Sequence, residues 1–463
     1  MTRKELFGGV GSIAAAALVL TLPAPAGLSP EGHRMAALFV VTLILFMTEA
    51  LPVAVTAMLA IGLQPLFGVA PIGAAIATAM SPVFYFVIAM FCIAQAFVSS
   101  GLDRRFALWL LARAGTDSRR VLAAFMGGTA VMSTVISDVP CTALFMAIAL
   151  GLFEKMGIRP GESRFAKSVM MGIPIAALIG GIGTPAGTSI NVLGLSLMTQ
   201  YGKVTIPFLH WAALGLPMVI VLVPVAWWAL LYCYPPEIAI IGPVSEVRAE
   251  QAAQGPLTAP EKKVLAVFGT MIVCWVASTW VKQLDVVIVS ILGAVAMFLP
   301  GMKLMGWKAV ERSTGWDALL MIAGVTSLGA ASTKSGLAQW LVDGSLGGLA
   351  GASPVVVVAV VSAFTVLIRL LLPIGPVVVA VVIPPIAILA ERSGANPALY
   401  ALPVVFTASC AFLLPLDAVP LVTYSRGYYG MLDMAKPGIL ISVVWVGVMT
   451  AVMVLLGPIL GLL

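Results

Sequence analysis

Charged residues are scarce in this chain. Asp, Glu, Lys and Arg make up 10% of its 463 residues and hydrophobic residues 61%, against about 25% and about 45 to 50% in a typical soluble protein. Neither residues 50 to 102 nor residues 204 to 236 contain any of these four residue types, and about 20 apolar residues are enough to cross a bilayer. The composition excludes a water-soluble enzyme, a disordered chain and a collagen-like chain. It predicts an all-α polytopic membrane protein.

Paired cysteines and clustered basic residues are also lacking. The five cysteines occur singly in apolar segments without a CxxC motif, so we expect neither a disulfide scaffold nor a cysteine-based metal site. The formal net charge is +6, but no basic cluster is interleaved with aromatic residues, which excludes nucleic acid as a partner. Basic loops are instead what insertion into a lipid bilayer requires.

Apolar runs and the breaks between them predict the order of the membrane segments. Uninterrupted spans are expected at 7–26, 33–49, 52–69, 80–112, 206–233, 264–281, 284–302, 317–342 and 437–461. Two longer blocks, 121–200 and 354–425, are interrupted by proline and glycine. The polar stretch at 235–263 is expected to be a cytoplasmic loop that contains a surface helix.

Each interrupted block predicts a re-entrant hairpin followed by a broken helix. The hairpin breaks are expected at Ser137-Asp138-Val139-Pro140 and Pro373-Ile374-Gly375-Pro376, and the helix breaks at residues 183–191 and 415–420. Backbone groups released by such breaks must be satisfied by protein, ions or water in a bilayer. The four breaks therefore predict a polar site near the middle of the membrane.

The two halves of the chain repeat. Ser100-Gly101-Leu102 recurs as Ser335-Gly336-Leu337, 235 positions later, and the two hairpin tips are 237 positions apart. Near-constant offsets between matching breaks are typical of duplicated transporters, whose substrate site lies at the repeat interface. Eleven transmembrane helices are expected. An odd number of crossings separates the two halves, so the two repeats are expected to have opposite orientations in the membrane.

Basic residues predict the orientation in the membrane. With a cytoplasmic N-terminus, 19 of the 25 Lys and Arg residues fall on the cytoplasmic side, four outside, and Lys334 and Arg369 within spans. This distribution satisfies the positive-inside rule. We therefore expect a multi-pass protein of the cytoplasmic (inner) membrane.

Three segments carry a resemblance to a known family. They are Met132 to Asp138, Gly180 to Thr184 with Gly187 to Asn191, and Ser409 to Pro415. They resemble the divalent anion:sodium symporter (DASS) family, in the family order of two hairpins, two broken helices and eleven crossings. The resemblance covers essentially the full chain and implies a homodimeric elevator-type transporter of di- or tricarboxylates or related small anions.

The resemblance also implies a division into scaffold and transport domains. Residues 1–112 and 206–342 would be mostly scaffold, the blocks 121–200 and 354–425 would form the transport domain, and 437–461 would be a C-terminal helix. The family carries Ser-Asn-Thr at each hairpin tip and Thr-Pro in each broken helix. Here the tips read Ser137-Asp138-Val139 and Ile374-Gly375-Pro376, and the broken helices read Thr188-Ser189 and Ala418-Val419. These departures predict altered sodium coupling.

A possible sodium site is expected in the first half only. Sodium, by analogy with other hard cations, takes several oxygen ligands, and we expect Ser133, Ser137, Asp138 and unwound carbonyls near Gly187 to supply them. No other cofactor is expected.

The second half has lost its hydroxyl and amide donors and has gained Arg369. A guanidinium is suited to a carboxylate because it donates in a bidentate fork, so we expect Arg369 to pair with Asp417 or with the anion itself. Asp417 could alternatively bind a second cation. The alternatives are structural roles. Asp138 and Asp417 could cap helices, and Arg369 could form a purely structural pair.

The candidate substrate-binding residues share a position at a hairpin tip or a helix break. They are Ser137, Asp138, Thr188, Ser189, Asn191, Arg369, Gly375, Pro376 and Ala418. Half-helix N-termini at such breaks present N–H groups and positive potential to an anion. A kink that is solvated by its own hydroxyl groups is the alternative for Thr188, Ser189 and Asn191.

The function expected from these features is secondary active transport of a small organic anion by elevator-like alternating access, without enzymatic activity. One alternative is a sodium/proton antiporter in which Asp138 and Asp417 exchange protons for sodium. A second is a sodium-independent anion exchanger. A third, a membrane receptor that binds an anion without moving it, is disfavoured because no loop is long enough for a signalling domain.

Overall fold

The computed structural model describes residues 3–48, 50–242, 244–281, 283–345, 351–372 and 374–462. In these residues, helices joined by loops make up the fold, and the β structure is limited to one isolated bridge between Asp117 and Ile240. The helices are α1 (Arg3–Thr21), α2 (Pro30–Thr48), α3 (Val53–Leu66), α4 (Ile72–Ala79), α5 (Pro82–Ser100), α6 (Leu102–Ala114), α7 (Ser118–Ser133), α8 (Asp138–Lys155), α9 (Arg164–Gly181), α10 (Ser189–Gly202), α11 (Phe208–Cys233), α12 (Val244–Ala253), α13 (Ala259–Ala277), α14 (Val286–Ala296), α15 (Trp307–Ser313), α16 (Trp316–Lys334), α17 (Leu337–Ser345), α18 (Pro354–Leu371), α19 (Gly375–Arg392), α20 (Pro397–Ala408), α21 (Ala418–Tyr424), the 3₁₀ turn η2 (Met431–Asp433) and α22 (Ala435–Leu456).

The same series of elements occurs twice. Helices α2 and α13 each have 19 residues, as do α5 and α16, while α8 and α19 each have 18. The packing repeats as well, because α3 packs on α16 as α14 packs on α5, and α7 packs on α9 as α18 packs on α20. This supports the duplication inferred from the sequence offsets. The inverted orientation of the two copies in a bilayer stays a prediction.

Two of the expected single spans are each divided into two helices. Residues 80–112 form α5 and α6, which meet at Gly101, and residues 317–342 form α16 and α17, which meet at Gly336. Both glycines have φ of +80°, in the left-handed region where a side chain would be strained. The prediction of unbroken spans was wrong because the repeated Ser-Gly-Leu sequence ends a helix instead of lying inside one.

Three of the four helix breaks lie where the sequence predicts them. Helix α7 ends at Ser133 and α8 begins at Asp138, α9 ends at Gly181 and α10 begins at Ser189, and α19 begins at Gly375. Pro373 lies outside the described residues.

The fourth break begins earlier than expected, because α20 ends at Ala408 and α21 begins only at Ala418. The unwound segment is held against α22, where a Cβ on Gly438 would lie 1.9 Å from the carbonyl oxygen of Phe412. This close approach of two backbones explains why the break is longer than residues 415–420.

The corresponding helices α9 and α20 form the centre of the molecule. Every residue of α9 after Lys167 is buried, and so is every residue of α20 after Pro397. Their sequences are apolar on all sides, which is the pattern of a helix surrounded by other helices. Because α10 and α21 continue from these two helices, the buried core also positions both helix breaks.

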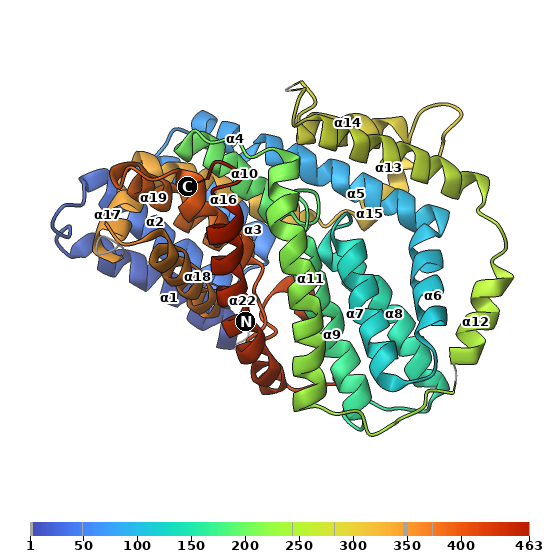
Figure 1. Ribbon diagram of the computed structural model, residues 1–463. Coiled ribbons are helices and arrows are strands. Elements are labelled where there is room, and N and C mark those ends of the chain that lie inside the picture. The colour runs from blue at the N-terminus through green and yellow to red at the C-terminus, as the bar shows by residue number, and fades with distance from the viewer. Residues whose placement is uncertain are drawn as a thin grey trace.

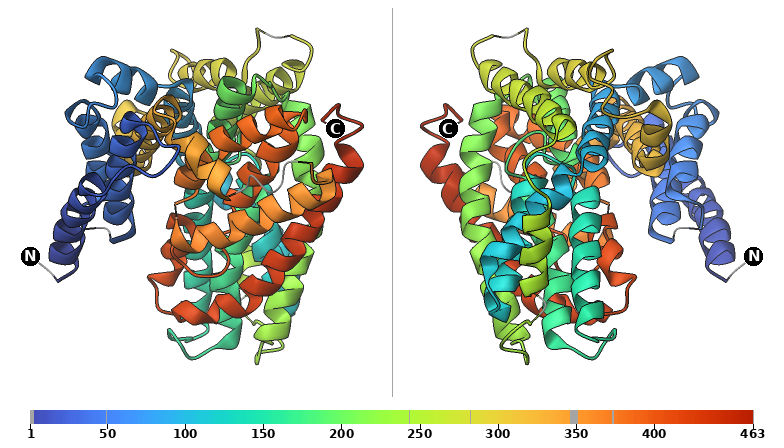
Figure 2. Two further views of the ribbon diagram at one scale, coloured as in Figure 1. Left: turned by 90° about the vertical axis from the view of Figure 1, so that its left-hand side faces the viewer. Right: turned by 90° about the vertical axis from the view of Figure 1, so that its right-hand side faces the viewer.

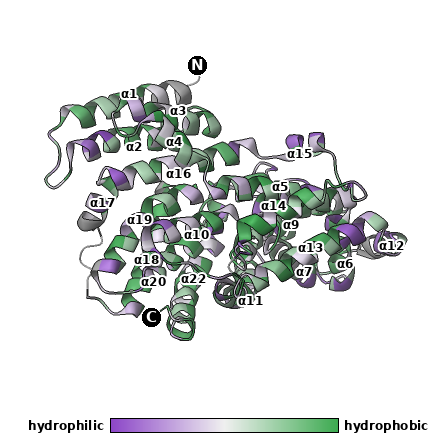
Figure 3. Cartoon of the chain, turned by 90° about the horizontal axis from the view of Figure 1, so that it is seen from above, coloured by the Kyte–Doolittle hydropathy of each residue, from purple (hydrophilic) through white to green (hydrophobic). Residues whose placement is uncertain are grey.

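The N-terminal helices lie apart from the first broken helix. In Figure 1, α1 to α3 and α17 lie on the left, and α6 to α9 with α11 on the right. Figure 2 shows α1 at the periphery. The loop expected at 235–263 contains a surface helix, α12, which packs on α6 and carries hydrophilic residues, coloured purple in Figure 3.

Helix α11 differs from the rest of the segment 206–342 in its packing. It packs against α7, α9 and α22, whereas α16 packs against α2, α3, α4 and α19. The division of 206–342 between scaffold and transport domain stays a prediction.

By length and apolar composition, three helical stretches among the described residues are long enough to cross a membrane: Ile72–Ser100, Phe208–Cys233 and Met431–Leu456. The other apolar helices are shorter because glycine, proline and the breaks divide them. The number of eleven crossings stays a prediction.

Candidate functional site

Both hairpin tips and both helix breaks line one cavity, with a volume of about 830 Å³. The first half contributes the start of α8 and the start of α10, and the second half contributes the start of α19 and the segment that enters α21. Helices α2, α5 and α16 close the remaining side. The tertiary structure thus brings together four segments that the sequence separates by up to about 280 residues.

Seven of the nine candidate substrate-binding residues line this cavity. They are Ser137, Asp138, Thr188, Ser189, Gly375, Pro376 and Ala418. Asn191 and Arg369 do not line it. The candidate Asp417 lines it too, whereas Ser133 and Gly187 lie behind the wall.

At the first tip, Asp138 is buried at the beginning of α8. The hydroxyl of Ser133 donates a hydrogen bond of 2.6 Å to Oδ1 of Asp138. Ser137 occupies the position before the helix and makes no side-chain cap, so Asp138 is not the helix cap that was one of its possible roles. Its carboxylate lies in the first turn, where the helix dipole favours negative charge.

The loop between α9 and α10 is held tightly against this tip. A Cβ at Gly187 would lie 2.3 Å from the carbonyl oxygen of Gly181 and 2.7 Å from that of Ser133, so glycine permits the contact. The side-chain amide of Asn191 donates to the carbonyls of Gly181 and Thr184, at 2.7 and 2.8 Å. Asn191 is fully buried and braces the loop instead of facing the cavity.

These groups fit a hard cation. Oxygen atoms of Ser133, Asp138 and Gly181 lie close together around Gly187, and oxygen is the ligand that such cations take. Within the described part of the chain, the buried Oδ1 of Asn191 has no hydrogen-bond partner, which leaves an acceptor available beside the same loop. Among the described residues, no cluster of three or more His, Cys, Asp or Glu side chains is placed so that it could hold a metal ion.

At the second tip a buried ion pair joins Asp417, which lines the cavity, to Arg369, which lies behind the cavity wall. Nη2 of Arg369 lies 2.6 Å from Oδ2 of Asp417, and their side chains are 3% and 11% exposed. Oδ1 of Asp417 accepts a hydrogen bond of 3.0 Å from the backbone N–H of Val419 and so caps α21. The pair expected from the sequence is present, and Asp417 has its expected capping role as well.

The cavity also contains residues that the sequence analysis did not single out. Asp317, at the start of α16, and Tyr424, at the end of α21, line it, as do Phe86 and Met90 of α5. Asp317 could have been recognised from the sequence, because it is an acidic residue in the first turn of an expected span. Nothing in the local sequence distinguishes the aromatic residues, because apolar residues fill every span.

The family model described as the sodium:sulfate symporter transmembrane region matches residues 3–463. A membrane protein of Cupriavidus necator is 29% identical over 433 residues, which covers 89% of this chain and 84% of the relative. The sodium-dependent dicarboxylate transporter SdcS of Staphylococcus saprophyticus is 25% identical, covering 96% of this chain and 90% of the relative.

Among solved structures, Neisseria gonorrhoeae MtrF, described as illuminating a class of antimetabolite efflux pumps, matches with a TM-score of 0.53 and 11% identity, covering 96% of this chain and 93% of that one. This similarity concerns the fold alone. The family match spans nearly the whole chain. The chain therefore belongs to the sodium:sulfate symporter family, the DASS family of membrane transporters.

Proposed function

We propose that this protein is a secondary active transporter that moves a small organic anion, di- or tricarboxylate-like or related, across the cytoplasmic membrane by elevator-type alternating access. The observation that carries the proposal is the single cavity lined by both hairpin tips and both helix breaks. Duplicated transporters place their substrate sites at such a repeat interface. The relatives named sodium-dependent dicarboxylate transporters support an anionic substrate.

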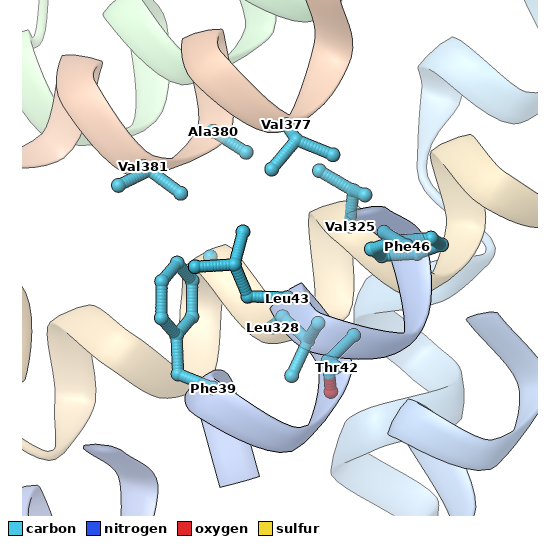
Figure 4. Close-up of a pocket in the computed structure, with 10 residues that line it drawn as sticks. Phe39, Thr42, Leu43, Phe46, Val325, Leu328, Val377, Ala380 and Val381 are labelled. Atoms are coloured by element: carbon cyan, nitrogen blue, oxygen red, sulfur yellow. The ribbon is translucent and has the colours of Figure 1, made fainter. Parts of the chain in front are cut away.

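Helices α7 to α10, α18 to α21, α11 and α22 are proposed to form the moving unit. Helices α2, α3 and α16 would be part of the scaffold. Where α2 and α16 meet α19, the contact is apolar: Phe39 and Leu43 face Val377 and Val381 around a cavity of about 20 Å³ (Figure 4). Apolar contacts are non-directional, so sliding across this surface breaks no hydrogen bond of its lining side chains.

The coupling of sodium binding to anion transport is proposed to differ between the two halves. In the first half, Asp138 and the carbonyls around Gly187 would hold a sodium ion. In the second half, the guanidinium of Arg369 supplies a fixed positive charge beside Asp417. A fixed cation needs no refilling during a transport cycle, so we expect fewer sodium ions per anion than two intact sites would require.

The antiporter alternative receives less support from this geometry. It requires Asp138 and Asp417 to release and take up ions, but both oxygens of Asp417 are engaged, one by Arg369 and one by the N–H of Val419. A sodium-independent exchanger would use the same cavity without the first-half cation. The protein is further proposed to be a homodimer with a cytoplasmic N-terminus.

Uptake into proteoliposomes tests the proposal. The purified full chain would be reconstituted, and accumulation of carboxylates, sulfonates, sulfate and phosphate would be measured with an inward sodium gradient, with a proton gradient and with neither. Sodium-stimulated accumulation of an organic anion is expected. Sodium/proton exchange without any anion requirement would contradict the proposal, and anion counterflow that ignores sodium would favour the exchanger.

A further inference from the structure

The two ends of the central cavity differ in the hydrogen bonds that they offer to a substrate. The first-half tip and break present the hydroxyl groups of Ser137, Thr188 and Ser189. The matching positions of the second half are Ile374, Gly375, Pro376 and Ala418. None of these four has a polar side chain, and Pro376 also lacks a backbone N–H.

Tyr424 and Asp417 do not remove this difference. Tyr424 is at the far end of α21, six residues from Ala418, so the two Cα atoms are separated by about 9 Å along the helix. The carboxylate of Asp417 has only acceptor atoms, and it already accepts from Arg369 and Val419. A second carboxylate placed at this end would therefore be desolvated without side-chain donors to replace water.

The charged residues around the cavity also favour a cargo with one anionic group. The lining contains Asp138, Asp317 and Asp417, whereas no Lys, Arg or His occurs among the described residues that line it. The positive charge of Arg369 is directed to Asp417, and Arg369 itself lines a separate small pocket behind the wall. Because Arg369 and Asp417 neutralise each other, a second negative charge on the cargo meets no net positive charge at the second-half end.

The remaining wall suits an apolar body. Phe86, Met90 and Phe91 of α5 face the cavity together with Met321 of α16 and Phe46 of α2. Aromatic and methionine side chains stabilise a ligand by covering its apolar surface, and methionine adapts to its shape. A compact dicarboxylate has little apolar surface that such a wall could cover.

We infer that the transported anion carries one anionic group on an apolar body, as in an aliphatic or aromatic monocarboxylate or monosulfonate. This inference rests on the transport of a small organic anion proposed above, and within that class it favours monoanions over di- and tricarboxylates. The anionic group lies at Ser137, Thr188 and Ser189, and the apolar body extends toward Ile374, Ala418 and α5.

A pair of probes that differ by one charge tests the inference. Benzenesulfonate and 1,3-benzenedisulfonate share an aromatic ring, both stay ionised, and neither crosses a bilayer as a neutral acid. Binding to the purified full chain would be measured by titration calorimetry in sodium-containing buffer, with succinate as the compact dicarboxylate and empty micelles as the blank. Uptake into proteoliposomes would be followed by mass spectrometry.

Benzenesulfonate is expected to bind at least ~10-fold more tightly than the disulfonate or succinate, because a second charged group would lose its hydration at an end of the cavity that offers no side-chain donors in return. Equal or tighter binding of either dianion would overturn the inference and leave the proposed function standing. If none of these anions, nor sulfate, phosphate or citrate, binds or is transported, the proposed function fails as well.

A substitution at the apolar end gives a second, independent readout. Ala418 is exposed to the cavity at the start of α21, and Ala418→Thr restores a hydroxyl there. The ratio of the succinate Kd to the benzenesulfonate Kd should fall several-fold. The matched control is Ala77→Thr, on the exposed face of α4 and outside the cavity, which should leave the ratio unchanged. An unchanged ratio in Ala418→Thr would contradict the assignment of this end to the apolar body.

Discussion

At the scale of single residues, Asp138 has the position of an ion ligand more than that of a structural cap. Its carboxylate accepts from Ser133, faces the cavity and lies against Gly181, where a Cβ would approach Oδ1 to 2.3 Å. The family has asparagine at this position. A carboxylate here adds a negative charge to the proposed sodium site, which strengthens its attraction for any cation, protons included.

Asp138→Asn should therefore shift the ion dependence of transport toward sodium. The amide keeps the size of the carboxylate and an acceptor oxygen, but it cannot take up a proton at this position. The measurement is anion uptake into proteoliposomes as a function of sodium concentration and of pH. Val139→Ala, which alters a neighbouring cavity residue without changing charge, serves as the control. The same sodium and proton dependence in Asp138→Asn and the original protein would argue against coupling at this tip.

The Arg369–Asp417 pair makes a second prediction at this scale. Removing one partner of a buried pair leaves an uncompensated charge, at a cost of about 3 to 5 kcal/mol. Arg369→Ala and Asp417→Asn should each abolish anion uptake while the protein still inserts into the membrane. The double variant Arg369→Met/Asp417→Asn removes both charges and should unfold at a higher temperature in detergent than Arg369→Ala. Near-normal uptake by Arg369→Ala would refute the role of a fixed cation.

At the scale of the elements, the second helix break depends on the approach of α22. The segment 409–417 is unwound, and further contacts link it and the end of α20 to α22: Trp445 donates to Thr407, and Cys410 lies 3.5 Å from the hydroxyl of Ser442. Gly438 is the point of closest approach. A side chain at this point would push α22 away from the segment that leads into the cavity.

Gly438→Ala is therefore expected to destabilise the protein by about 1 to 3 kcal/mol or more, the range for overpacking a core. The melting temperature in detergent and the affinity for the transported anion should both fall. Gly447→Ala, on the same helix, has nothing within 4 Å of the added Cβ and is the matched control. Equal melting temperatures for the two variants would contradict the close backbone contact.

The polar loop that joins the two halves is stabilised by Glu261, at the start of α13. Its carboxylate accepts from Nε of Arg105 at 2.6 Å and from the backbone N–H of Thr258 in a capping box. Burial by itself raises the pKa of Glu261, but the hydrogen bonds from Arg105 and Thr258 outweigh it and leave the pKa below its ordinary value of 4.5. This loop lies outside the expected membrane spans.

A lowered carboxylate pKa predicts a loss of stability in acid. The contribution of Glu261 is complete above its ordinary pKa of 4.5 and is lost as the pH falls toward its lower folded-state value. Glu261→Gln should therefore melt at a lower temperature at neutral pH and show a shallower decline below pH 4.5. Glu250→Gln, which removes an exposed pair with Arg104, should change the melting curve little. Identical acid profiles for Glu261→Gln and the original protein would contradict this role.

At the scale of the whole molecule, the proposed motion takes place across the apolar contact between α19 and the pair α2 and α16. Leu43 and Val381 lie on opposite sides of this contact (Figure 4). A covalent link between them would hold the two units in one arrangement. Alternating access needs at least two arrangements.

Cross-linking of Leu43→Cys/Val381→Cys with a short bifunctional maleimide, in a background without the five native cysteines, should stop uptake. Anion binding in detergent should persist, because the cavity lining is unchanged. Each single-cysteine variant treated with the same reagent controls for modification alone. Full transport by the cross-linked protein would exclude movement across this surface.

Local sequence information was enough to predict the membrane class and three of the four breaks, and it indicated the duplication that the repeated packing supports. Hydrophobicity is a property of each residue, and proline and glycine tend to interrupt helices, so the breaks around Asp138 and Ser189 were predicted from local patterns. The divisions at Gly101 and Gly336 could have been predicted from the same repeated tripeptide, which ends both helices with a left-handed glycine.

Contacts between distant segments required the folded chain. Whether Arg369 reaches Asp417 depends on how α18 packs on α20, and the length of the second break depends on Gly438 of α22. The apolar wall of α5 could not be recognised beforehand, because in a membrane protein apolar residues face lipid, core and cavity alike. Only the packing of the two repeats selects which of those side chains meet the transported anion.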